Sequence, residues 1–253
     1  MSAFRARDGA YVAATASLGL DVSLAPGAVI HDGVTIGAAT TIGAAAVVHA
    51  GTVIGGRCVV EDHAVVGKRP RLRPGSSAAG EVEPLLVADE VTICCGAVVY
   101  AGARLGHGVI IGDQAQVRER AVIGERSVLG RGSAVEFDAR VGARVLIQTL
   151  VYVTAGAVVE DDVFIGPGVV TTNDDTMGRH PRGEPLRAPV LRRGCRVGGG
   201  AVLTPGAVIG EEAYVAAGAV VTRDVAAREV VIGVPGRVAR TVGDEDLLER
   251  WRR

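Results

Sequence analysis

An aliphatic residue recurs at every sixth position along most of this chain. Steps of six residues land on Val, Ile or Leu each time from 12 to 66, from 87 to 165 and from 197 to 221. The residue two positions earlier is usually small, as Ala28 is before Ile30. Residues two apart on a strand point to the same face. Each hexad therefore offers one large and one small side chain to a common interior.

The remaining positions of the hexad are rich in glycine, aspartate and glutamate, which are typical of turns. A short strand and a turn every six residues indicate a solenoid of parallel strands. A six-residue period cannot keep one face of a 3.6-residue helix buried, and an ordinary β-sandwich needs longer strands. We therefore predict an all-β parallel β-helix over residues 1–242.

The repeat is interrupted twice, and neither interruption carries a second periodic pattern. We therefore predict loops at 67–86 and 172–196 rather than a second domain. Loops on a rigid solenoid commonly carry function. Residues 243–253 predict a short C-terminal helix flanking the last coil. Acidic residues fill its first turn and arginines its last, which suits the helix dipole.

Composition excludes several classes of protein. The net charge is −1, which gives no electrostatic case for nucleic acid. No apolar run is long enough to span a membrane, and the N-terminus lacks the apolar core of a signal peptide; we expect a cytoplasmic protein without membrane partners. Cys58 and Cys195 take small inward positions, whereas Cys94 and Cys95 share a turn without Cys-x-x-Cys spacing. We expect no metal.

The aliphatic, small and glycine-marked hexad resembles that of hexapeptide-repeat proteins. Their fold is a left-handed parallel β-helix in which three hexads make one triangular coil. The handedness comes from this resemblance, since the usual crossover rule favours the other hand. The resemblance also implies a homotrimer with parallel axes and with its sites between subunits.

Two segments resemble enzymes of this group. Residues 160–174 (EDDVFIGPGVVTTND) are similar to a segment of nucleotide-sugar N-acetyltransferases, in which a coil leads into "T-N-D" and a loop. Residues 218–225 and 231–238 resemble the last coil and exit of acyl-CoA-dependent hexapeptide acetyltransferases. The resemblance implies transfer of acetyl from acetyl-CoA to the amino group of an amino sugar, nucleotide-linked through UDP or dTDP.

The same resemblance implies roles for named residues. Asn173 and Asp174 would face the acceptor amine, and Asp174 would hold or deprotonate it. His180 is the candidate base if the acceptor is a hydroxyl. Some relatives place a glutamate where this chain has Ala155. The pantetheine arm would lie against backbone groups of Gly200, Ala201, Ala217 and Gly218, and the nucleotide of CoA near Thr222 and Arg223.

Each coil is 18 residues long, and the substrate-binding candidates lie on coils near these two segments. Glu136, Gln148 and Tyr152 are the polar candidates on the preceding coils. A basic run at 68–73 is either a solvated loop or a phosphate clamp, because arginine matches phosphate geometry. At roughly 4.8 Å per strand, the two loops are about 22 Å apart, a span that a sugar nucleotide bridges in large part. The diphosphate candidates are Arg69, Arg71 and Arg179.

Three alternatives stay open. The first is O-acetyl transfer to a sugar or a small alcohol, with His180 as base. The second is a metal enzyme resembling the γ-carbonic anhydrases, because His31 and His49 are one coil apart and a neighbouring subunit could add His63. The third is a non-catalytic scaffold.

Overall fold

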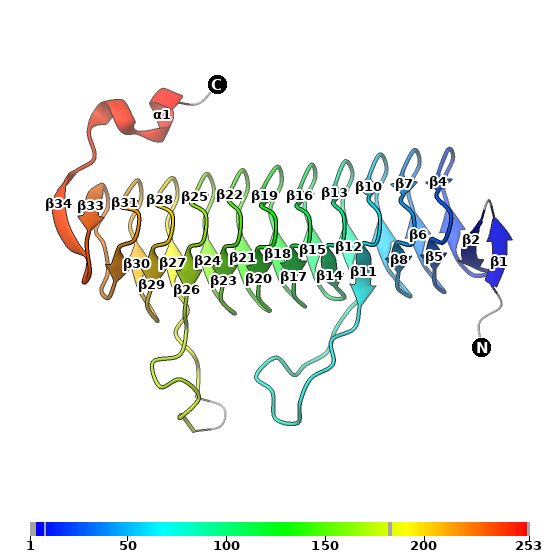
Figure 1. Ribbon diagram of the computed structural model, residues 1–253, viewed down its shortest axis with the longest axis horizontal. Coiled ribbons are helices and arrows are strands. Elements are labelled where there is room, and N and C mark those ends of the chain that lie inside the picture. The colour runs from blue at the N-terminus through cyan, green and yellow to red at the C-terminus, as the bar shows by residue number, and fades with distance from the viewer. Residues whose placement is uncertain (1–3, 8, 182–183, 252–253) are drawn as a thin grey trace.

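The computed structural model describes residues 4–7, 9–181 and 184–251. The chain forms a straight rod of stacked coils with its two ends at opposite ends of the rod (Figure 1). Three sheets run along it, and equivalent strands of successive coils pair in parallel, as Val29 does with Val47. This confirms the predicted all-β parallel solenoid, and the coil agrees with the left-handed β-helix that the resemblance implies.

The first sheet has 12 strands and begins with a hairpin. Its first strand is antiparallel to the second, and this hairpin covers the N-terminal end of the rod (Figure 1). In spatial order the strands are β1 (Phe4–Arg7), β2 (Ala10–Ala13), β5 (Val29–Ile30), β8 (Val47–Val48), β11 (Val65–Lys68), β14 (Val98–Tyr100), β17 (Gln116–Val117), β20 (Ala134–Val135), β23 (Tyr152–Val153), β26 (Val170–Thr171), β29 (Val202–Leu203) and β32 (Val220–Val221).

The second sheet has 10 strands, all of them two residues long and parallel. They are β3 (Ser17–Leu18), β6 (Thr35–Ile36), β9 (Val53–Ile54), β12 (Leu86–Val87), β15 (Arg104–Leu105), β18 (Val122–Ile123), β21 (Arg140–Val141), β24 (Val158–Val159), β27 (Val190–Leu191) and β30 (Val208–Ile209).

The third sheet has 12 strands and ends in a second antiparallel pair, which covers the C-terminal end of the rod (Figure 1). Its strands are β4 (Ser23–Leu24), β7 (Thr41–Ile42), β10 (Val59–Val60), β13 (Thr92–Ile93), β16 (Ile110–Ile111), β19 (Val128–Leu129), β22 (Leu146–Ile147), β25 (Phe164–Ile165), β28 (Arg196–Val197), β31 (Tyr214–Val215), β33 (Glu229–Ile232) and β34 (Arg237–Thr241).

The core is a column of aliphatic side chains with small residues between them. Ile111 and Ala115 are fully buried, whereas Ile110, next to Ile111 on the same strand, is 40% exposed. The repeat continues one hexad beyond Ile165 with Thr171 in the aliphatic position of β26. Its hydroxyl is buried but accepts from the Thr154 amide at 2.8 Å and donates to the Tyr152 carbonyl at 3.1 Å. A polar residue fits here because both of its bonds are made.

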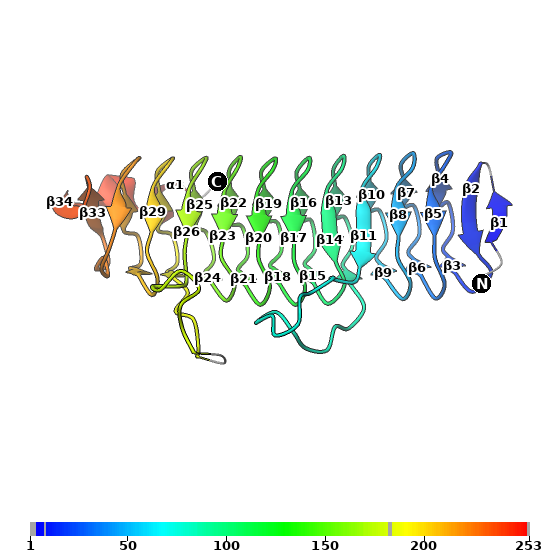
Figure 2. The same ribbon diagram turned by 60° about the horizontal axis from the view of Figure 1, so that its bottom comes forward.

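Both loops leave the rod at the same corner (Figures 1 and 2). The first runs over 69–85, between β11 and β12, close to its predicted bounds. The second runs over 172–189 and is shorter than the predicted 172–196. The difference arises because β27 pairs with β24 and β30, so the hexad frame resumes at Leu191 and not at Val197.

Two corners of the triangular coil matter below. We call the turns between the first and second sheets the loop edge, since both loops leave from it (Figure 2). We call the turns between the third and first sheets the return edge. Each turn is fixed by backbone hydrogen bonds to its neighbours, such as Gly200 N to Pro167 O at 2.8 Å. Side chains one coil apart therefore form columns along each edge.

The predicted C-terminal helix is in two short pieces, a 3-10 turn at Asp244–Asp246 and α1 at Leu248–Trp251; residues 252–253 lie outside the described chain. The Leu248 amide donates to Glu212 at 3.0 Å, and Glu249 pairs with Arg193 at 3.0 Å. The segment thus flanks the side of the coils, while β34 covers the end. No helix among the described residues has the length and apolar character to cross a membrane.

Candidate functional site

The second loop is organised around the carboxylate of Asp174. Its Oδ1 accepts from the amide and the hydroxyl of Thr176 at 2.8 and 2.9 Å. Its Oδ2 accepts from the Gly178 amide at 2.6 Å and lies 3.5 Å from His180 Nδ1. Asp174 and His180, both named from the sequence, are therefore brought together, with side chains about one quarter exposed.

The hydrogen bonds of Asp174 decide its protonation. The bond from the Thr176 amide, followed by that from Gly178, lowers the pKa of Asp174 to about 2. The carboxylate stays ionised at neutral pH and is too weak a base to take a proton from an acceptor. His180 Nδ1 lies 3.3 Å from the Thr176 hydroxyl, which itself donates to Asp174, and 3.5 Å from Asp174 Oδ2. A proton on Nδ1 can therefore be held by Thr176 and Asp174, which leaves Nε2 of the imidazole free to act as the base.

Asn173 joins the loop to the solenoid. Its side-chain amide donates to the carbonyl of Ala155 at 3.0 Å, and its own carbonyl accepts from the Arg187 amide at 3.0 Å. Ala155 lies one coil before Asn173, as the sequence predicted, and it contributes a backbone carbonyl where some relatives have a carboxylate. Asn173 holds the start and the end of the loop in place.

A column of polar side chains runs along the loop edge between the two loops. Arg118 bonds both oxygens of Glu119 at 2.8 Å and lies 3.2 Å from Glu136. The side chain of Glu119 has no exposed surface, and that of Glu136 is 15% exposed. Burial raises the pKa of Glu136, an effect that Arg118 opposes. This edge thus carries a partly desolvated cluster of three charges.

Aromatic rings surround this cluster. The Arg118 guanidinium lies 5.2 Å from the ring centre of Tyr100 and 5.9 Å from that of Phe137. Tyr152 lies on β23, is 39% exposed, and has a pKa raised by burial and by Glu136. Charged groups beside the partly exposed ring of Tyr152 suit a polar ring such as a sugar or a nucleobase.

Gln148 lies apart from these residues. It follows β22 on the return edge, is exposed, and accepts from the Ser133 hydroxyl through its backbone carbonyl at 2.7 Å. Within one chain the structure does not bring Gln148 to the loop edge.

The first loop presents its basic residues beside acidic ones. Arg69 lines a pocket together with Glu81 and Glu83. Arg71 and, in the second loop, Arg179 are exposed. The first loop rests on the solenoid where Arg120 donates to the Ala78 carbonyl at 3.2 Å. Five strand steps separate β11 from β26, or about 24 Å at 4.8 Å per step.

The residues expected to bind the cofactor fall on two edges. Gly200 and Gly218 lie on the return edge at φ of +68° and +69°, with open space above each. The amides of Gly200, Ala201 and Gly218 already donate to carbonyls of the solenoid, and the Ala201 carbonyl accepts from Val170. Of this set, the other carbonyls and the Ala217 amide could bind a ligand. Thr222 and Arg223 instead line a pocket on the loop edge with Gly236 and Arg237.

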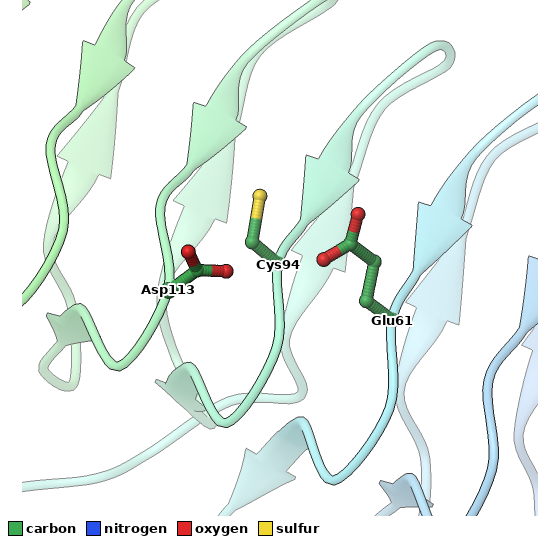
Figure 3. Close-up of side chains that lie close together, drawn as sticks. All are labelled: Glu61, Cys94 and Asp113. Carbon is green, nitrogen blue, oxygen red and sulfur yellow. The ribbon is translucent and has the colours of Figure 1, made fainter.

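Two groups of potential metal ligands lie on the solenoid. The rings of His31 and His49 are stacked, with centroids 5.3 Å apart. Burial, followed by His31 and Lys68, lowers the pKa of His49. No third ligand of the described chain joins this pair, and His63 lies on the other edge, after β10. A different group, made of Glu61, Cys94 and Asp113, does converge on the return edge (Figure 3).

Comparisons with known families agree with the hexad pattern. Residues 188–223 match the model described as bacterial transferase hexapeptide (six repeats), and residues 33–68 match the hexapeptide repeat of succinyl-transferase. Both matched segments thus carry hexapeptide repeats. No curated protein gave a significant match.

Solved structures similar to this chain include several acyltransferases. The UDP-N-acetylglucosamine acyltransferase of Francisella novicida is 18% identical, with 96% of this chain and 72% of that one covered and a TM-score of 0.47. AntD, an N-acyltransferase from Bacillus cereus in complex with dTDP and coenzyme A, is 17% identical (64% and 82% covered, TM-score 0.41). A Vibrio cholerae hexapeptide-repeat acetyltransferase complexed with acetyl coenzyme A is 24% identical (56% and 72%, TM-score 0.39). At these identities the similarity supports the fold only, and all three TM-scores are below 0.5.

Arg118 and Glu119 were not predicted from the sequence as site residues. Both lie one coil before Glu136 and Phe137, so the 18-residue spacing that placed Glu136 also placed them. In the sequence these residues are an Arg-Glu pair in a turn, a pattern that normally indicates solvent-exposed surface. The complete burial of Glu119 is visible only in the folded chain.

Proposed function

We propose that this protein is a coenzyme A-dependent acyltransferase that moves acetyl from acetyl-CoA to the amino group of an amino sugar, nucleotide-linked through UDP or dTDP. The observation that carries the proposal is the contact between Asp174 and His180. It lies in the loop that follows the segment resembling nucleotide-sugar N-acetyltransferases. The transferase repeat matched at both ends of the rod supports the same reaction class.

In the proposed reaction the neutral amine attacks the carbonyl carbon of the thioester. His180 Nε2 takes the proton that the nitrogen releases, and the ionised Asp174 stabilises the resulting imidazolium through Nδ1. The C–S bond then breaks, and the coenzyme A thiolate leaves and takes up a proton. Asp174 is a positioning residue in this scheme, because its lowered pKa suits it to hold a cation rather than to remove a proton.

Acetyl-CoA would lie between two subunits of a homotrimer. The cofactor candidates occupy two edges of one chain, the return edge at Gly200 and Gly218 and the loop edge at Thr222 and Arg223. A groove formed by the return edge of one subunit and the loop edge of the next would unite them. Light scattering of the purified protein tests this assembly, and a monomer that turns over would contradict it.

The acceptor would lie along the loop edge between the loops. Glu136 and Tyr152 would contact its sugar, and Arg118 would keep Glu136 ionised. Arg69, Arg71 and Arg179 would bind the diphosphate, since guanidinium groups match phosphate oxygens. Asn173 would hold the loop rather than the substrate, because its side chain donates to Ala155.

The test is release of coenzyme A from acetyl-CoA with a panel of UDP- and dTDP-linked amino sugars and of free amino sugars. We expect turnover on one nucleotide-linked amine, reduced about 100-fold in His180→Ala and in Asp174→Asn. Glu184→Gln is the matched control, because Glu184 is exposed in the same loop. Acetyl-CoA binding without turnover on any amine would reject the acceptor class; no binding would reject the acyltransferase.

O-acetyl transfer is the second candidate, and the imidazole held by a carboxylate is the observation that favours it. A hydroxyl needs a base, whereas a free amine at high pH is already nucleophilic. With an amine acceptor, His180→Ala should therefore recover activity as the pH rises above the pKa of the amine. With a hydroxyl acceptor the loss should persist at every pH.

A further inference from the structure

Three side chains that can bind metal converge on the return edge, on a different corner from the loops. Glu61, Cys94 and Asp113 follow β10, β13 and β16, so each comes from a different coil of the stack (Figure 3). One ligand atom from each lies within 4.8 Å of the others. Cys95, next to Cys94, directs its Sγ at Glu61 Oε2, 3.3 Å away.

The cluster concentrates negative charge without a positive partner. No lysine or arginine of the described chain forms an ion pair with Glu61 or Asp113. A cation at this point would offset the charge of the two carboxylates and would favour the thiolate of Cys94.

We propose that Cys94, Glu61 and Asp113 form a binding site for a divalent cation of the zinc class. Zinc accepts thiolate sulfur and carboxylate oxygen together, whereas magnesium and calcium take oxygen ligands only. Around a tetrahedral zinc ion, bonds of about 2.0–2.3 Å place the ligand atoms roughly 3.3–3.8 Å apart. The three ligand atoms all lie within 4.8 Å of one another, so small side-chain rotations would bring them into this range. A water or Cys95 completes four ligands.

The geometry is preorganised by the solenoid. Parallel pairing of β10 with β13 and of β13 with β16 fixes the three turns relative to one another, and rigid elements hold ligand sets well. The proposed site goes beyond the sequence, because the absence of Cys-x-x-Cys spacing says nothing about ligands that come from neighbouring coils. The site is separate from the proposed acyl transfer and does not depend on it.

The test uses full-length, tag-free protein stripped with a chelator and kept reduced with a phosphine. Titration with Co²⁺ should saturate at one ion per chain with a sulfur-to-cobalt charge-transfer band, and Zn²⁺ should displace the cobalt. Cys94→Ser should abolish the band. Glu61→Gln and Asp113→Asn should each weaken binding at least about tenfold. Zn²⁺ should raise the melting temperature of wild type and leave that of Cys94→Ser unchanged.

Asp21→Asn is the matched control, because Asp21 is an exposed aspartate in a turn between the second and third sheets, on a different corner from the cluster. It should bind Co²⁺ like wild type, and circular dichroism should show that every variant is folded. Absence of saturable binding to wild type would overturn the proposal. So would a charge-transfer band that survives in Cys94→Ser, or Glu61→Gln and Asp113→Asn variants that both bind with unchanged affinity.

Discussion

At the scale of single residues, burial sets the chemistry of the ionisable groups. Glu119 has no exposed side-chain surface, and its partner Arg118 is 19% exposed. The electrostatic attraction between the two charges offsets the cost of removing them from water. Loss of one residue therefore leaves the other charge buried and only partly compensated. Asp174 differs, because backbone amides donate hydrogen bonds to its carboxylate and stabilise the negative charge.

Glu119→Ala should lower the free energy of unfolding by about 3 kcal/mol, the lower end for a broken buried pair, because Arg118 keeps Glu136. Glu211→Ala is the control, since Glu211 pairs with Arg193 at a site where its side chain is 57% exposed. Its loss should cost less than about 1 kcal/mol. Denaturant titration of the two variants measures the difference, and equal costs would contradict the argument.

The thiol of Cys94 should alkylate slowly at neutral pH. Its pKa of about 11 keeps it protonated, and the thiolate is the nucleophile. In metal-free Cys95→Ser protein, the rate with iodoacetamide should rise about tenfold per pH unit up to about pH 11. Glu61→Gln in this background should react faster at pH 7.5, because one of the repelling carboxylates is gone. A plateau near pH 8.5 would show an ordinary thiol.

At the scale of elements, each strand is only two residues long in most coils, so inward and outward faces alternate within one strand. One residue joins the core and its neighbour faces outward. The column of inward side chains, rather than the individual strand, is the stabilising unit, since each inward residue packs against those one coil before and after it.

Ile111→Ala and Ile110→Ala test this on one strand. Ile111 is fully buried, and its truncation should cost about 3 kcal/mol from lost burial and the cavity left behind. Ile110 is 40% exposed, and its truncation should cost less than about 1 kcal/mol. Unfolding midpoints give both values. A cost at Ile110 as large as that at Ile111 would mean that this face is buried in an assembly.

At the scale of the whole molecule, the stacked coils set the distance between the two loops. Each coil contacts only its neighbours, so an added coil should be tolerated and should move everything beyond it by about 4.8 Å. The hairpins at the two ends keep the rod closed at both termini.

Inserting a copy of residues 35–52 between Ala103 and Arg104 should move the two loops farther apart without changing any residue within them. We expect a folded protein whose KM for a nucleotide-linked acceptor rises at least about tenfold, with acetyl-CoA binding unchanged. The control is the same insertion between Thr52 and Val53, outside the interval between the loops. An unchanged KM in the first variant would show that the acceptor does not bridge the loops.

The sequence by itself determined the repeat, the parallel solenoid and the origin of the loops, because a strict period leaves one way to bury all the aliphatic residues. It also placed Asn173, Asp174 and His180 in one loop. The sequence prediction ended the second loop too late, at residue 196. The short strand β27 offers only one aliphatic residue of the hexad frame, Leu191, before Val197. Only the tertiary structure set Asp174 against His180, buried Glu119, and brought Glu61, Cys94 and Asp113 together. These depend on the register between coils and on the course of a loop, and local sequence preferences fix neither.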